Sequence, residues 1–208
     1  MVIDTIVQGV RNYFYFFTSI IFLVLAGCGN NNHNHADFPL LNFDVDVSLL
    51  SSSILIDNSF QFYPPNGWDN IAPEQLAAAK NIVSCDSAAM FPMELLNIFK
   101  SDLGASCVIS QVTSDSNLSW FLTDEFQKTL SHNFNSNNVT KGTYTLNNKK
   151  IVQYRIITQD VIAFKIFCNI NNSIYQIDYF IPSKIYQSEI KKVESSIGSI
   201  TLPKLGKE

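Results

Sequence analysis

The second half of the chain alternates apolar stretches with short polar interruptions, and this spacing predicts a run of β-strands. The apolar stretches are rich in β-branched and aromatic residues and occupy 139–146, 151–158, 161–170 and 173–181. The interruptions are pairs of turn-forming residues, Asn147-Asn148, Gln159-Asp160 and Asn171-Asn172. Asn tolerates the positive φ that two-residue hairpin loops need, so the pattern predicts four antiparallel strands joined as a meander.

The stretch 161–170 is apolar on both faces, since Phe164 and Ile166 alternate with Ala163 and Phe167. A strand of this kind is central in its sheet and is covered on both sides. We therefore predict one sheet with helices on both faces. A closing helix is expected after Pro182-Ser183. Its apolar stripe is Tyr186, Ile190, Val193 and Ile197, and Gly198 is expected to stop it.

The first half of the chain predicts a mixture of strands and helices. Strands are expected at 53–56, 60–63 and 106–113, with a turn at 57–59 and a strand end at Pro64-Pro65-Asn66-Gly67-Trp68. Helices are expected at 73–83 and 93–99. A further helix begins after Thr123, which can cap it; Asp124 and Glu125 suit its first turn, and Phe126 and Leu130 form its buried face.

The N-terminal segment has the parts of an export signal. An apolar run reaches Leu25, and Leu25-Ala26-Gly27-Cys28 then precedes an Asn-rich stretch. This arrangement resembles the lipobox of bacterial lipoproteins. The resemblance implies cleavage between Gly27 and Cys28 and acylation of Cys28, with palmitate among the acyl chains. Two alternatives remain open: an uncleaved membrane anchor, or a secretory signal cleaved elsewhere. Gly29 stands where Gram-negative families often have an Asp that retains the protein at the inner membrane, so it favours the outer membrane.

Removing such a signal leaves 208 − 27 = 181 residues, which fits one domain and a tether. We expect residues 1–27 to be the signal, 28–45 the lipidated Cys and flexible tether, and 46–208 the globular domain. His33 and His35 fall in the tether, where two ligands are too few for a specific metal site. The net charge of −4 gives no indication of the basic surface that typically binds nucleic acid.

The remaining cysteines are odd in number, so they cannot all pair. Cys85 and Cys107 could form a disulfide in an oxidising compartment. Cys168 falls in an apolar stretch and is read as a small buried hydrophobe.

Two short motifs carry a family resemblance. The strand ending "FQFYPPNGW" and the closing "VESSIGSI" resemble the start and end of PsbP-like domains, over roughly residues 50–201. That fold is shared by PsbP, the Mog family of Ran-binding import factors and DcrB-like envelope lipoproteins. The resemblance implies the α+β class, as an α/β/α sandwich around a largely antiparallel sheet with a C-terminal four-strand meander and a closing helix. It implies little about function, because these relatives bind different partners and most are not enzymes.

Hairpin parity predicts one polar row across the sheet. Two-residue loops set Lys141 opposite Tyr154, Tyr154 opposite Lys165, and Lys165 opposite Asp178. The row is either a structural cross-strand pairing or a patch for a ligand or partner. His132 stands at the end of the helix after Thr123, where a cation complements the helix dipole, and no G-x-S-x-G motif accompanies it.

These observations favour a non-catalytic lipoprotein of the cell envelope that is anchored through Cys28 and binds or stabilises a protein partner. No cofactor, metal or nucleic acid is expected. The lipidated protein is expected at the outer membrane, facing the periplasm or the cell surface. The alternatives are an envelope hydrolase with an unrecognised site, and a carrier of a small ligand or metal.

Overall fold

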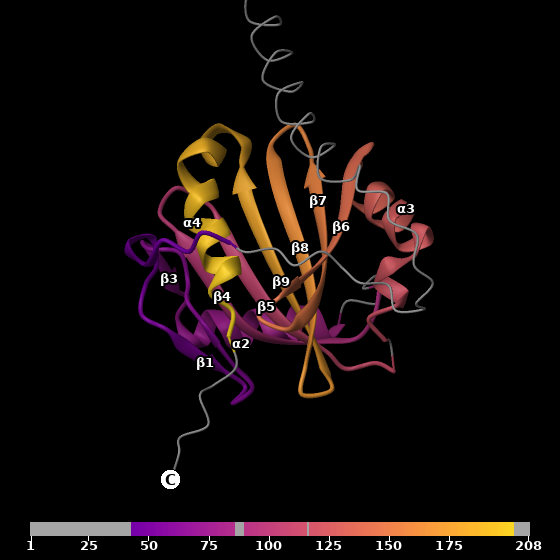
Figure 1. Ribbon diagram of the computed structural model, residues 1–208, viewed down its shortest axis with the longest axis horizontal. Coiled ribbons are helices and arrows are strands. Elements are labelled where there is room, and N and C mark those ends of the chain that lie inside the picture. The colour runs from indigo at the N-terminus through magenta and orange to yellow at the C-terminus, as the bar shows by residue number, and fades with distance from the viewer. Residues whose placement is uncertain (1–42, 86–89, 116, 202–208) are drawn as a thin grey trace, which may run out of the picture. The chain divides into compact units, whose positions relative to one another are not determined.

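A seven-stranded antiparallel sheet organises the chain in the computed structural model, which describes residues 43–85, 90–115 and 117–201 (Figure 1). The strand order is β3-β4-β5-β9-β8-β7-β6, and β1 and β2 form a separate hairpin. The strands are β1 (Ile54–Ile56), β2 (Phe60–Phe62), β3 (Trp68–Asn70), β4 (Met93–Ser101), β5 (Ser106–Val112), β6 (Asn138–Leu146), β7 (Lys149–Ile157), β8 (Val161–Ile170) and β9 (Ser173–Pro182).

The last four strands form the meander that the sequence predicts. The two Asn-Asn loops adopt the left-handed conformation, with φ of 48° and 61° in the first and 52° and 64° in the second. Each loop is two residues long, so the strands stay in the register expected from parity. The open sheet ends at β3 and β6.

Strand β8 lies inside the sheet, between β7 and β9. The side chains on its two faces belong to two different hydrophobic clusters. Phe164 and Ile166 are 6% and 0% exposed on one face, and Ala163 and Phe167 are buried on the other. The predicted central strand is therefore confirmed, and so is the α+β class with helices covering an antiparallel sheet.

The helices are α2 (Pro73–Cys85), α3 (Asp124–Asn133) and α4 (Tyr186–Gly198), with short 3-10 turns η1 (Val47–Leu49), η2 (Trp120–Leu122) and η3 (Ser183–Ile185). In Figure 1, α4 lies in front of the sheet and α2 crosses behind it. Helix α4 packs with the β1–β2 hairpin on the face of Phe164, and α3 packs on the face of Phe167. Thr123 caps α3 as expected, its Oγ1 accepting from the Phe126 N–H at 3.2 Å.

Strand β4 corrects one sequence-based expectation, because residues 93–99 form a strand and not a helix. The segment Met-Glu-Leu-Leu favours a helix locally, yet it pairs with β5, and the other end of the same strand pairs with β3 as well. A register shift between Leu95 and Asn97 interrupts the alternation that identifies a strand. Non-local pairing therefore outweighs local propensity here.

Gly198 ends α4 where the sequence predicts, but for a different reason. The helix does not finish in a left-handed residue, since Ser199, the C-cap, has φ −82°. A Cβ on Gly198 would lie 2.5 Å from Cβ of Phe43 and 2.8 Å from Cγ2 of Val45. The glycine is needed because the chain before β1 crosses α4 at close range.

Cys107 and Cys168 are fully buried and carry free thiols. The side chain of Cys85 lies outside the described residues, so the suggested pairing of Cys85 with Cys107 stays a prediction. Burial raises the pKa of the Cys168 thiol to about 12, which suits the packing role expected for it.

The N-terminal features, Gly27, Cys28, His33 and His35, also lie outside the described residues. Within the described ranges, no helix is long and apolar enough to span a membrane.

Candidate functional site

The predicted polar row is present. Lys141 is paired with Tyr154, Tyr154 with Lys165, and Lys165 with Asp178, across β6, β7, β8 and β9. All four residues project from the sheet face that α3 partly covers, the face to which Tyr154 and Phe167 belong. The row therefore lies on the sheet face that α3 partly covers. Its two halves have different surroundings.

One half of the row fastens the segment before α3 to the sheet. The hydroxyl of the fully buried Tyr154 donates to the carbonyl of Phe121, and Lys141 Nζ donates to the carbonyl of Leu122 at 2.7 Å. Lys141 also pairs with Asp124 at 3.2 Å. Burial, and to a smaller extent the charge of Asp124, raise the pKa of Tyr154 to about 12. These contacts position η2 and the start of α3.

The other half is a buried ion pair with an amide beside it. Lys165 Nζ lies 2.6 Å from Asp178 Oδ2, and only 12% and 9% of the two side chains are exposed. Gln176 Nε2 donates to the same oxygen, also at 2.6 Å. Asp178 Oδ1 and Gln176 Oε1 are buried and have no hydrogen-bond partner within the described part of the chain. We refer to these two atoms as the open acceptors.

Leaving the open acceptors without a partner lowers the stability of the fold. A buried polar atom left without a partner costs about 1–3 kcal/mol. A buried ion pair also carries a desolvation penalty that its mutual attraction often fails to recover. The cluster of Lys165, Asp178 and Gln176 thus carries a free-energy cost that the described contacts do not offset, which makes it a candidate site.

A pocket of about 230 Å³ opens over two members of this cluster, Lys165 and Gln176. Lys165 and Gln176 line it from the sheet, and Asn133 lines it from the end of α3. The other lining residues are apolar and come from the start of β4 and the segment before it, and from α3 and its end: Met90, Phe91, Met93, Phe126, Leu130 and Phe134. The pocket therefore combines apolar walls with a polar floor, as small-ligand sites do.

The local sequence explains the positions of the apolar side chains that form the pocket walls. Phe126 and Leu130 share one face of α3, which turns them toward the sheet. Phe91 packs edge-on against the rings of Phe121 and Phe167 at 5.3 and 6.2 Å between centroids. This aromatic cluster fixes the β4 side of the pocket against the η2 side.

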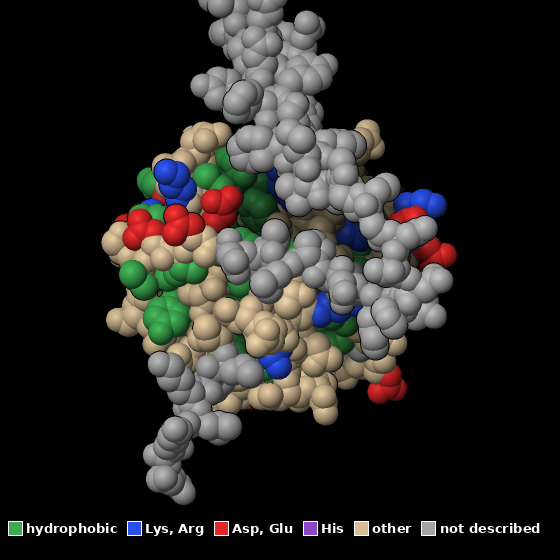
Figure 2. Space-filling view, in the orientation of Figure 1, with side chains coloured by type: hydrophobic (Ala, Val, Ile, Leu, Met, Phe, Trp, Pro, Cys, Tyr) green, Lys and Arg blue, Asp and Glu red, His purple; other side chains and the backbone are tan. Residues whose placement is uncertain are grey.

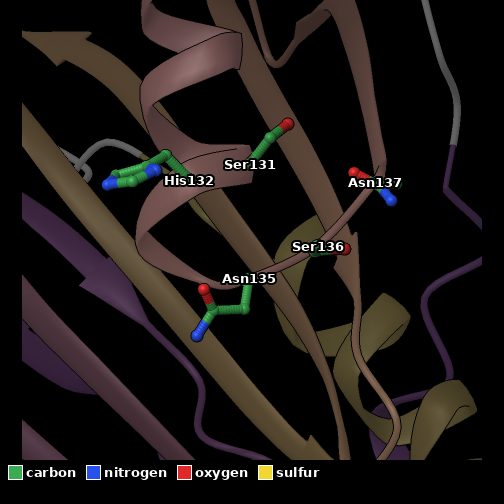
Figure 3. A pocket seen from close by; sticks show the side chains of 5 residues that line it. All are labelled: Ser131, His132, Asn135, Ser136 and Asn137. Carbon is green, nitrogen blue, oxygen red and sulfur yellow. The ribbon is translucent and has the colours of Figure 1, made fainter.

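His132 lies over a separate polar hollow of about 370 Å³, lined also by Ser131, Asn135, Ser136 and Asn137 (Figure 3). The imidazole and the Ser131 hydroxyl point to opposite sides of α3. The serine hydroxyls bond to backbone carbonyls, Ser131 to Gln127 at 3.0 Å and Ser136 to Ile157 at 2.7 Å. In the described ranges no hydrogen bond joins His132 to either serine, and no three potential metal ligands cluster.

Charge on the visible face is dispersed. Figure 2 looks onto the α4 face, where acidic side chains gather at the left and Lys and Arg side chains lie apart from one another. The visible part of the described surface thus has no single basic stripe, in keeping with the net charge of −4.

Sequence reasoning found Lys165 and Asp178 but missed Gln176 and the pocket. Gln176 precedes Asp178 by two residues, so strand parity already places both on one face. The pocket walls gave no such signal. They include Met90, Phe91 and Met93, from a segment whose strand the sequence did not reveal.

Comparisons with protein-family models and with curated protein sequences find no match. Among solved structures, the chain is similar to the solution structure of cyanobacterial PsbP (CyanoP) from Synechocystis sp. PCC 6803. The TM-score is 0.43 at 13% sequence identity, and the match covers 86% of this chain and 99% of that chain.

Proposed function

We propose that the protein is a non-catalytic binding module, tethered to a membrane of the cell envelope by acyl chains on Cys28. The tether is supported by Leu25-Ala26-Gly27-Cys28 at the end of the apolar run. One acyl chain binds a bilayer only marginally, whereas the two or three on a lipoprotein Cys hold firmly. The polar stretch after Cys28 would leave the domain free to meet a partner in the envelope.

The observation that carries the binding role is the pocket over Lys165 and Gln176. Gln176, which carries one of the two open acceptors, lines the floor beside Lys165, and the walls are apolar. No described residue donates a hydrogen bond to these acceptors, so a ligand or a partner group that donates one would form a bond that the described part of the fold does not supply.

Acylation is tested with Cys28→Ser in cells fed radiolabelled palmitate. We expect label in the wild type and none in the variant, which should remain an unprocessed precursor. Cys168→Ala is the control, because it removes a thiol buried in the core and should leave the label unchanged. Equal incorporation into Cys28→Ser would refute the anchor.

Partner binding is tested by photocrosslinking in whole cells. Asn133 is exposed and lines the pocket, so p-benzoylphenylalanine at this position would stand within reach of a partner group entering it. Lys128 is exposed on the same helix away from the pocket and serves as the matched control. A protein adduct from position 133 and none from 128 is expected. Equal adducts, or none at 133, would contradict a protein partner at this site.

The pocket also favours a second candidate, a carrier of a small ligand. Its volume of about 230 Å³ is below the range typical of drug-sized ligands, so it suits one small molecule or one side chain. A carrier would give no protein adduct from position 133 and would still bind a small molecule at the pocket floor.

A further inference from the structure

Two side chains at or beside the pocket floor, Asp178 and Gln176, use only part of their capacity to accept hydrogen bonds. Asp178 accepts twice through Oδ2 and, in the described part of the chain, not at all through Oδ1. Gln176 donates through Nε2 while its Oε1 stays open. Lys165 has three N–H donors and directs one of them to Asp178. The two side chains that line the floor, Gln176 and Lys165, therefore offer an acceptor and ammonium donors together.

The floor is also close to neutral. The Lys165 ammonium and the Asp178 carboxylate offset each other at 2.6 Å. An anion in the pocket would meet the open acceptor of Gln176, and its attraction to Lys165 would compete with that of Asp178. A cation would meet the positive charge of Lys165, whose side chain lines the pocket. Either charge would also lose part of its hydration between largely apolar walls.

We propose that the pocket binds a small neutral molecule with an apolar body and a head that both donates and accepts hydrogen bonds, such as a carboxamide or an alcohol. The head would accept from Lys165 Nζ and, once the buried Gln176 amide turns toward the pocket, donate to Gln176 Oε1, and the body would lie against Phe126, Leu130 and Met93. This inference rests on the small-ligand form of the proposed function and names its ligand class.

The size of the ligand follows from the volume. At the roughly 30 Å³ that a water molecule takes in the liquid, about 230 Å³ corresponds to roughly eight non-hydrogen atoms. A single aromatic ring with an amide or hydroxyl head fits this size. Benzamide, benzoate and benzamidine share it and differ in the charge of the head, so they form a matched set of probes.

The test titrates the three probes into the full-length ¹⁵N-labelled protein and follows the side-chain amide resonances of Gln176. We expect benzamide to shift them and to bind at least tenfold tighter than benzoate or benzamidine. Nuclear Overhauser contacts from its ring to the methyl groups of Met93 and Leu130 would place it between the walls. Tighter binding of benzoate would show an anion site and overturn the proposal. Equal binding of the three, or a pocket that holds water only, would also overturn it.

A variant gives the second arm. Gln176→Met keeps the length of the side chain and removes the open acceptor, so benzamide affinity should fall at least tenfold. Gln111→Met is the matched control, because Gln111 bonds to Ser173 on a neighbouring strand and does not line the pocket. The Overhauser contacts in the wild type decide the matter independently if Gln176→Met does not fold.

The two proposals fail separately. A protein adduct from position 133 together with no benzamide binding would refute the ligand class and leave the tethered binding module standing. Benzamide binding without an adduct would refute the protein partner and support the carrier.

Discussion

Removing the charge of Lys165 should destabilise the protein strongly, because Asp178 would stay buried without its cation. Lys165→Met keeps the aliphatic stem and deletes the ammonium that lies 2.6 Å from Asp178 Oδ2. Breaking a buried pair on one side costs about 3–5 kcal/mol. With a Tm change of about 2–4 °C per kcal/mol for a chain of this size, the Tm should fall roughly 6–20 °C.

The companion variants turn this loss into a coupling energy. Asp178→Asn should cost a similar amount, because it strands the ammonium. The double variant removes both charges and keeps a side-chain oxygen for Gln176 Nε2, so its loss should be only about 1–3 kcal/mol. Chemical denaturation measures all four proteins, and the double variant should be clearly more stable than the sum of the single losses predicts.

The exposed ion pair between Lys141, a member of the same row, and Asp124 is the control. Lys141 and Asp124 lie 3.2 Å apart, but 86% of the Asp124 side chain is exposed. Asp124→Asn should cost about 0.2–1 kcal/mol, and raising the salt concentration should weaken that pair while hardly affecting the Lys165 pair. Additive losses at Lys165 and Asp178, or a loss at Lys165 that salt abolishes, would refute the argument from burial.

Three further substitutions test other parts of the fold. Phe164→Ala should lower the free energy of unfolding by about 3–5 kcal/mol in chemical denaturation, because it empties a core position; a loss below about 1 kcal/mol would contradict the packing. Tyr154→Phe leaves a carbonyl unpartnered and should cost about 1–3 kcal/mol. The raised pKa of Tyr154 gives stability that is complete below pH 10 and is lost as the pH rises toward 12, so the variant should show a shallower alkaline loss than the wild type; an unchanged slope would be evidence against it. Gly198→Ala should cost about 1–3 kcal/mol and increase hydrogen exchange near Phe43, whereas Gly142→Ala, with nothing within 4 Å of its new methyl group, should not.

The meander could be predicted from sequence because its determinants are local. Asn pairs with positive φ set the length of two hairpin loops, and loop length sets which residues face each other. That is why the register from Lys141 to Asp178 follows from parity alone. The two apolar faces of β8 likewise required cover from both sides, whatever the identity of the covering helices.

Strand β4 could not be predicted in the same way, because its determinants are distant. Its residues favour a helix, and a register shift at Leu95 and Asn97 hides the alternation. The strand exists because β3 and β5 flank it. Missing β4 also meant missing the pocket, since Met90, Phe91 and Met93 reach the face of Lys165 only once that segment is placed beside β5.

The contrast between the two halves of the polar row bears on why the pocket cluster exists. Above Tyr154 and Lys141, backbone carbonyls of the segment before α3 satisfy the polar groups, so that half serves the fold. Above Lys165, α3 leaves a pocket and the open acceptors. Apolar side chains of similar size would often be at least as stable as a buried ion pair, so stability alone does not explain the cluster. A Lys165→Met, Asp178→Asn double variant that keeps most of its stability and loses benzamide binding would separate the two roles. Retained binding would mean that the pair serves the fold after all.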